Sequence, residues 1–303
     1  PEQTGVANTA VTMNAASMEN SGFEFSATYR NRDHAFKYDI SANLSTLKNK
    51  VTSLGFGTKS YITGAYATYV GQEIGQFYGW VYKGIARTQD DLDNNAVQQG
   101  ANIGDCLYED ISGPNGEPDG VIDAYDQTVL GSGLPKVNFG LSTHMEYKGF
   151  DLNISTYGVL NYHVSDDIYN SLNSCYGYGN KEVGMLDANR WSEDGSTYLS
   201  NVPRTYAANN ATLGWNDLFS SRKIQNAAYW KIANVELGYN FPDKWFGGYV
   251  SGVRLYVSAQ NLYTFTGYKG YNVDYAGGTF TPGYNFCSFP SARTFMCGLH
   301  FTF

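Results

Sequence analysis

The sequence predicts an all-β protein, an antiparallel transmembrane β-barrel with long extracellular loops. Stretches of about ten residues alternate between apolar and polar side chains, which is the period of a strand with two different faces. The connections between these stretches are short and long in turn, as at the two ends of an outer-membrane barrel. Aromatic residues make up 16% of the chain although the mean hydropathy is −0.37, a combination that fits alternating strands better than disorder.

Nine strands are expected from the alternation. In the last of them, Phe295, Leu299 and Phe301 share one parity, and His300 and Thr302 share the other. The apolar parity changes phase in "YWKIANVELGYNF", which predicts a bulge near Ala233 and Asn234. The expected strands span residues 22–31, 34–47, 61–70, 74–83, 136–147, 149–162, 227–241, 251–265 and 293–303.

The connections give the strands a direction. Short ones are expected at "NRDH", "GQEI", "YKGF" and "PDKWFGGYVS", and long ones at residues 48–60, 84–135, 163–226 and 266–292. If the last strand ends at the periplasmic rim, every short connection falls on the periplasmic side. Aromatic residues near strand ends then predict an interfacial girdle, formed by Trp80, Trp230, Trp245, Tyr82 and Tyr249. Because single-chain bacterial barrels have even strand numbers, nine strands lead us to expect further strands upstream.

Composition and motifs exclude several classes of function. The net charge of −8 and the scattered basic residues argue against a nucleic-acid partner. The four cysteines form no CxxC pair, and nothing in their spacing argues for a disulfide. The four histidines are dispersed, and the sequence contains no GxSxG, HExxH or P-loop motif, so no enzyme is expected.

Six stretches, in this order, carry a resemblance to a known family. They are "MENSGFEFSATYRN", "GQEIGQFYGWVYKGI", "DGVIDAYDQTVLGSGLPKVNFGLSTHMEYKGFDLNISTYGVL", "AAYWKIANVELGYNFP", "VRLYVSAQNLYTFTGYKGYNVD" and "FPSARTFMCGLHFTF". Together they resemble the C-terminal part of SusC/RagA-type TonB-dependent outer-membrane transporters, from about residue 3 to the end of the chain. The resemblance implies that residues 1–303 form about nine strands of a 22-stranded barrel in the bacterial outer membrane.

The resemblance also implies a function and partners. It implies import of a nutrient, an oligosaccharide or a peptide, together with a SusD-like surface lipoprotein. An N-terminal plug, the other half of the barrel and the contact with TonB would lie upstream of this chain, and outer-membrane lipid would surround the wall. The alternative is a secreted, soluble, glycan-binding β-sandwich, in which the apolar parity would face a shared core.

The acidic stretch "NGEPDGVIDAYD" resembles a calcium-binding loop. Oxygen ligands are wanted at positions 1, 3, 5, 7, 9 and 12, and glycine at position 6, which Gly120 fills. The candidate ligands of Ca²⁺ are Asn115, Glu117, Asp119, Val121 through its backbone carbonyl, Asp123 and Asp126. Family members often begin a shorter version of this loop at an aspartate that corresponds to Asp110, which could replace Asn115. The alternative is a solvated acidic turn without metal.

Aromatic residues of the long loops are the candidate ligand-binding residues: Tyr176, Tyr178, Trp191, Trp215, Tyr271 and Tyr284. Flat aromatic faces stack on sugar rings, and neighbouring amides bond hydroxyl or peptide groups. The alternative is that these side chains pack the loops together or contact the lipoprotein, since Tyr and Trp are common at interfaces.

Overall fold

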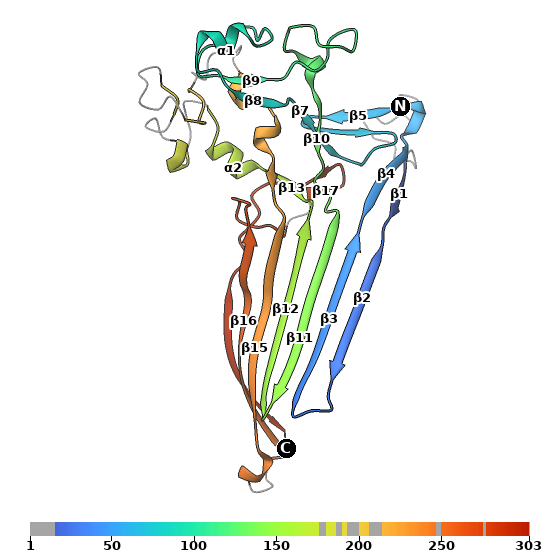
Figure 1. Ribbon diagram of the computed structural model, residues 1–303, viewed down its shortest axis with the longest axis vertical. Helices are drawn as coiled ribbons and strands as arrows, with labels where there is room; N and C mark the ends of the chain where they lie inside the picture. Colours follow the sequence, from blue (N-terminus) through green and yellow to red (C-terminus); the bar gives the residue numbers. More distant parts are fainter. Residues whose placement is uncertain are drawn as a thin grey trace, which may run out of the picture.

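The computed structural model describes residues 16–175, 180–185, 190–192, 200–205, 214–246, 250–274 and 277–302. Its main feature is a seven-stranded antiparallel sheet, the wall, in the order β2-β3-β11-β12-β15-β16-β20 (Figure 1). The wall strands are β2 (Glu24–Asn31), β3 (Phe36–Thr46), β11 (Val137–Tyr147), β12 (Phe150–Leu160), β15 (Tyr229–Phe241), β16 (Gly252–Thr266) and β20 (Thr294–Thr302). Among the described residues, no helix is both long and apolar enough to cross a membrane.

One face of the wall is apolar and exposed. Cross-strand neighbours share this face: Val257 lies between Leu237 on β15 and Cys297 on β20. The described strands provide no second sheet against it, which overturns the sandwich alternative, and lipid covers such a face in a barrel. Its exposed side chains include Phe25, Tyr29, Ile40, Leu44, Leu141, Leu160, Leu237, Leu255, Val257, Leu299 and Phe301.

Aromatic residues gather at both ends of this face. At the lower end of the wall in Figure 1, the ring centroids of Phe150 and Tyr239 lie 4.6 Å apart, and those of Phe241 and Trp245 lie 5.9 Å apart. At the outer end, Trp230 stacks on Phe265 with 5.3 Å between ring centroids. These are the two girdles expected where a barrel meets the lipid headgroups.

The opposite face of the wall is polar and internally paired. Arg254 binds Asp151 through both guanidinium and carboxylate forks and also reaches Glu236 at 2.7 Å. A Cβ at Gly238 would lie 2.5 Å from this guanidinium, so a larger residue there would displace the side chains of the pair. Farther along, His144 contacts Asn153 at 2.6 Å and Glu146 at 2.8 Å. Such a face is suited to line a water-filled lumen.

Two of the nine expected strands are wrong. Residues 61–70 and 74–83 do not join the wall but form the short strands β5 (Ser60–Thr63), β6 (Tyr66–Tyr69) and β7 (Gln76–Gly79), with β10 (Thr128–Gly131) beside β7. Gly64, Gly71 and Gly75, all at positive φ, interrupt the chain there, so no strand can run the length of the wall. Residues 47–136 are therefore one outer connection, and the "GQEI" turn lies at the outer end.

The alternation of short and long connections survives this correction. Residues 32–35, 148–149 and 242–251 connect wall strands at one end, and residues 47–136, 161–228 and 267–293 connect them at the other. The bulge expected near Ala233 and Asn234 is confirmed by a register shift between Ile232 and Asn234. The long connections gather in a layer at one end of the wall, which we call the loop layer (Figure 1).

The loop layer contains most of the remaining elements. β1 (Ser17–Ser21) pairs with β4 (Lys48–Ser53), β8 (Tyr82–Ile85) with β9 (Cys106–Tyr108), and β17 (Gly277–Gly278) with β18 (Thr281–Pro282). β13 (His163–Asp166) lies between β14 (Gln225–Asn226) and β19 (Tyr284–Asn285). The α-helices are α1 (Gln89–Asp93) and α2 (Asp167–Leu172). Short 3₁₀ helices span Gly55–Gly57, Ala124–Asp126, Val183–Met185, Gly214–Asp217 and Ser221–Lys223, and Asp243–Trp245 forms another after β15.

The expectation for Trp80 and Tyr82 is also wrong. Both side chains are partly buried in the loop layer, where they pack against a cluster formed by Cys106, Tyr108 and Ile122. The indole Nε1 of Trp80 donates to the carbonyl of Asp123 at 2.9 Å, so this ring is fixed within the loops and contributes to no girdle. The sequence places both residues near an expected strand end, and that strand is not in the wall. Tyr249 lies outside the described residues.

Candidate ligand-binding site

The segment 267–293 is fixed to the neighbouring loop by a buried carboxylate. Asp166 is 3% exposed and accepts from the backbone N–H of Tyr169 at 2.7 Å, capping α2. The same carboxylate accepts from the hydroxyl of Tyr268 and from Nδ2 of Asn285 at 2.9 Å. Burial, followed by the proximity of Asp166, raises the pKa of Tyr268 and keeps its phenol a donor.

The same segment is fixed a second time, to the wall. Asp274 accepts from Nζ of Lys231 at 2.5 Å and from the hydroxyl of Tyr157 at 3.2 Å. Both partners belong to the polar face, Lys231 on β15 and Tyr157 on β12. Lys231 is only 4% exposed, and a buried ammonium without a partner would destabilise the fold by about 3–5 kcal/mol. Asp274 therefore holds the segment against the polar face of the wall.

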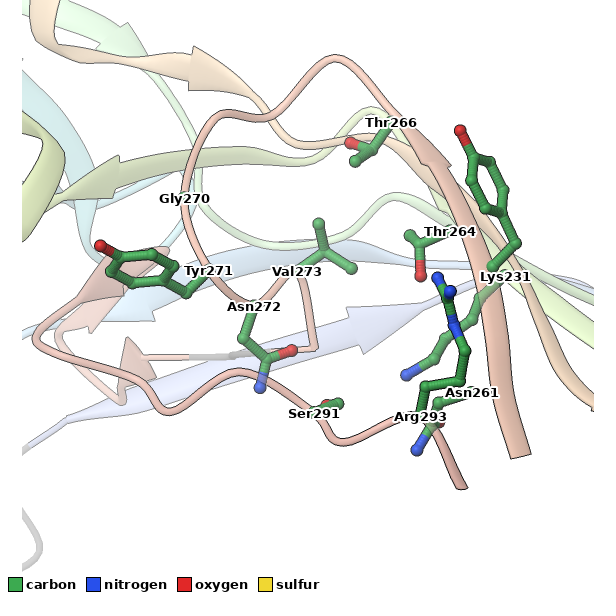
Figure 2. Close-up of a pocket in the computed structure, with 11 residues that line it drawn as sticks. Lys231, Asn261, Thr264, Thr266, Gly270, Tyr271, Asn272, Val273, Ser291 and Arg293 are labelled. Atoms are coloured by element: carbon green, nitrogen blue, oxygen red, sulfur yellow. The ribbon is translucent and has the colours of Figure 1, made fainter. Parts of the chain in front are cut away.

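A cavity of about 320 Å³ lies beside this second attachment (Figure 2). Its wall residues include Lys231, Thr264 and Thr266, and its loop residues include Tyr271, Asn272, Ser291 and Arg293. The cavity follows from unequal strand lengths. β20 begins at Thr294 opposite Gln260, whereas β16 continues to Thr266, so residues 261–266 extend beyond the last paired residue of β20.

Two amides hold the backbone around this cavity. Asn261, at φ 52°, donates from Nδ2 to the carbonyl of Ala292 at 3.0 Å. Asn272 donates from Nδ2 to the carbonyl of Phe289 at 3.2 Å and accepts from the backbone N–H of Asp274. These bonds use only part of each amide, and the hydroxyl, phenol and guanidinium groups of the lining are further groups that a ligand could contact.

The aromatic residues predicted to bind ligand have different positions. Tyr271 is 61% exposed at the cavity, with its hydroxyl directed away from Lys231 in Figure 2. Trp191 is 8% exposed and packs over Gly104. Trp215 packs on Tyr108, and its Nε1 donates to Gln99 O at 3.1 Å.

Tyr284 belongs to β19, where its ring contacts Tyr66 and stacks on Phe286. Tyr176 and Tyr178 lie outside the described residues. Of the described candidates, the structure brings Tyr271 to the cavity and places Trp191, Trp215 and Tyr284 in the packing of the loop layer. Sequence reasoning missed Lys231, Thr264 and Arg293. The feature that brings them together is the offset between the ends of β16 and β20. This offset can be recognised only when the pairing register of the two strands is known.

A further ion pair joins two of the long loops. Arg204 binds both carboxylate oxygens of Asp105, at 2.7 and 2.8 Å, and Asn216 donates to the same carboxylate at 2.8 Å. Asp105 is 2% exposed. The adjacent thiol of Cys106 is fully buried, which raises its pKa to about 12 and keeps it protonated. This cluster fixes the two long loops to each other.

The carboxylates of the acidic loop bond to the backbone. Asp126 is 0% exposed and accepts from the N–H groups of Ile111, Ser112 and Asp123. Asp110 accepts from the N–H groups of Asp119 and Gly120. In the part of the chain that the structure describes, no three His, Cys, Asp or Glu side chains converge as a metal site.

The other candidate ligands of this loop are also dispersed. Asn115 and Glu117 are exposed, and Val121 forms a β-bridge with Val97. In this arrangement the residues do not form a calcium cage. The calcium site stays a prediction, with Asp110 as well as Asn115 at its start.

Comparison with known proteins identifies relatives of one kind. No family model matches the chain. It is 30% identical to TonB-dependent receptor P3 of Formosa agariphila, over 100% of this chain and 30% of the receptor. It is 26% identical to TonB-dependent receptor SusC of Bacteroides thetaiotaomicron, over 98% of this chain and 27% of SusC. The chain thus spans 30% and 27% of the length of these two relatives, both of which are described as TonB-dependent receptors.

Solved structures agree with the fold. The RagAB peptide importer in its closed-closed state matches with a TM-score of 0.75 and 22% identity, over 99% of this chain and 31% of that chain. The RagAB peptide transporter matches with a TM-score of 0.74 and 21% identity, over 94% of this chain and 29% of that chain. At this identity the structural match establishes the fold, in which the seven described strands form part of a barrel wall.

Proposed function

Because the chain is related along its length to SusC/RagA-type TonB-dependent receptors of the outer membrane, we propose that it contributes one wall of a nutrient importer. The nutrient is an oligosaccharide or a peptide. The observation that carries this proposal is the polarity of the wall: one face is apolar and exposed, the other is polar, and the folded loops gather at one end. Such a wall presents a binding layer above a lumen.

The lining of the cavity fits both kinds of oligomer. The exposed ring of Tyr271 offers a face for a sugar or a side chain, and the hydroxyls of Thr264 and Ser291 bond either hydroxyl or peptide groups. One structural relative is described as a peptide importer, which supports the peptide alternative. The similarity to SusC supports import in general and favours neither kind of oligomer.

A surface lipoprotein of the SusD type is the partner we propose for the loop layer. Several aromatic side chains of the loop layer are open to solvent, among them Phe56 at 86%, Phe286 at 61% and Phe289 at 88% exposure. Large apolar side chains exposed in this way are typical of interaction surfaces. Coupling to TonB would pass through the plug, in the part of the receptor that these residues do not include.

Purification and uptake test the proposal together. The full-length receptor, tagged and extracted from outer membranes in detergent, is expected to retain a SusD-like lipoprotein at about one copy per receptor. Cells that carry it should accumulate a fluorescent oligosaccharide or peptide, and a protonophore should abolish the accumulation. A receptor that purifies without a lipoprotein and passes solutes equally with and without the protonophore would be a passive pore, contrary to the proposal.

A further inference from the structure

Among the described residues, two cationic side chains, Lys231 and Arg293, line the cavity between β16 and the segment 267–293. Lys231 is neutralised by Asp274, at 2.5 Å. Arg293 is exposed, and within the described residues it forms neither an ion pair nor a side-chain hydrogen bond. Figure 2 shows both Lys231 and Arg293 at the border of this cavity, with the guanidinium of Arg293 directed toward Thr264. The lining therefore carries one uncompensated positive charge.

The backbone position of Arg293 is fixed, although its side chain has no hydrogen-bond or ion-pair partner among the residues that the structure describes. Arg293 immediately precedes β20, whose first residue, Thr294, pairs with Gln260. One residue earlier, the carbonyl of Ala292 accepts from Nδ2 of Asn261 at 3.0 Å. The backbone on both sides is thus attached to β16, which places Arg293 at the edge of the cavity.

A carboxylate is the group that this arrangement suits. A guanidinium presents two parallel N–H donors that match the two oxygens of a carboxylate. The hydroxyls of Thr264 and Ser291, which line the same cavity, supply further donors. Because Asp274 already neutralises the ammonium of Lys231, that ammonium attracts a second anion only weakly. The carboxylate of a ligand would therefore be bound mainly by Arg293.

We propose that this cavity is a subsite for a carboxylate on the imported oligomer, with Arg293 as its principal contact. The proposal rests on the proposed import of an oligosaccharide or a peptide. The carboxylate has two possible sources, a uronic acid unit of a glycan or the C-terminus of a peptide. Both present the same planar anion, and the test below separates them.

The test compares acidic and capped probes on the full-length receptor with its lipoprotein, by isothermal titration. The glycan probes are trigalacturonate and its methyl ester, and the peptide probes are an alanine pentapeptide with a free C-terminus and its amide. We expect the acid form of one pair to bind roughly tenfold or more tightly than its capped form, the range of a charge-assisted hydrogen bond. The pair that shows this preference identifies the source of the carboxylate.

Variants of Arg293 complete the test. Arg293→Gln is expected to reduce the preference to about onefold, while Arg293→Lys, which keeps the charge but not the fork, should retain part of it. Because the guanidinium has no partner within the described part of the fold, neither change should alter thermal stability. The matched control is Lys59→Gln, which removes one positive charge from an exposed position of another outer loop and should leave the preference intact.

The possible failures are distinguishable. If every pair that binds does so with equal affinity for its acid and capped forms, or if Arg293→Gln preserves the preference, the carboxylate subsite is overturned while the proposed import stands. If neither pair binds the wild-type complex, the proposed substrate classes are overturned and the subsite falls with them.

Discussion

Val257→Arg is the substitution that best tests which face of the wall meets lipid. Val257 is 52% exposed on the apolar face of β16, five positions above Gly252. A rise of about 3.3 Å per residue and a tilt of about 40° place it about 13 Å above the lower end. That is the middle of an apolar band about 25 Å tall, where an arginine costs about 2–4 kcal/mol.

Unfolding of the full-length receptor in lipid vesicles measures this cost. A loss of about 2–4 kcal/mol raises the unfolded-to-folded ratio by roughly 30- to 1,000-fold and lowers the urea midpoint. The folded fraction is read from the mobility difference between unheated and heated samples on gel electrophoresis. The control is Gln260→Arg, on the polar face of the same strand, where an added charge faces the lumen. Equal midpoints for the two variants would refute the assignment of the faces.

Three further outcomes are expected. Cys287 is exposed in an outer loop and should react with a membrane-impermeant maleimide on intact cells at pH 8. Cys106 is buried, with its pKa raised to about 12, and should react only after unfolding. Labelling of Cys106 in the folded protein, detected by mass spectrometry, would contradict its burial. Asp105→Asn should leave Arg204 without its ion pair and destabilise the loop layer by about 1–3 kcal/mol. Proteases should then cleave the outer loops faster. An unchanged cleavage rate would show that this ion pair does not hold the loops together. If the acidic loop binds Ca²⁺, the cation should raise the melting temperature of the wild type and not that of Asp119→Ala, and a chelator without effect on the wild type would exclude the site.

The wall could be predicted from sequence because alternation is a local property. Each of the seven wall strands lies within two residues of its expected ends, and β16, expected at 251–265, spans Gly252–Thr266. The same local signal failed at residues 61–70, where Tyr66, Ala67 and Thr68 are buried within the loop layer. Alternation shows that a segment is extended, but it does not show which segment lies beside it.

The cavity could not be predicted, because its parts meet only through register. Lys231 and Asp274 are separated by 43 residues, and nothing near either residue indicates the other. Aromatic content was the available signal for a binding loop. It identified Tyr271 at the cavity, but it also identified Trp191, which is 8% exposed and packs the loops. Large aromatic side chains stabilise loops as readily as they bind ligands, so type alone does not separate the two roles.

The offset between β16 and β20 explains how one chain can keep its wall and vary its binding site. Below Gln260 the two strands pair residue for residue, and the wall needs only that alternate side chains be apolar. Above it, β16 continues without β20, and segment 267–293 is fixed there by Asp166 and Asp274. Within the segment, residues between Tyr268, which Asp166 binds, and Asp274 can change without disturbing the wall, and Tyr271 is one of them. The same holds for Arg293, which follows both attachments. Ligand preference should therefore follow substitutions at these positions, while assembly in the membrane follows the alternating strands below.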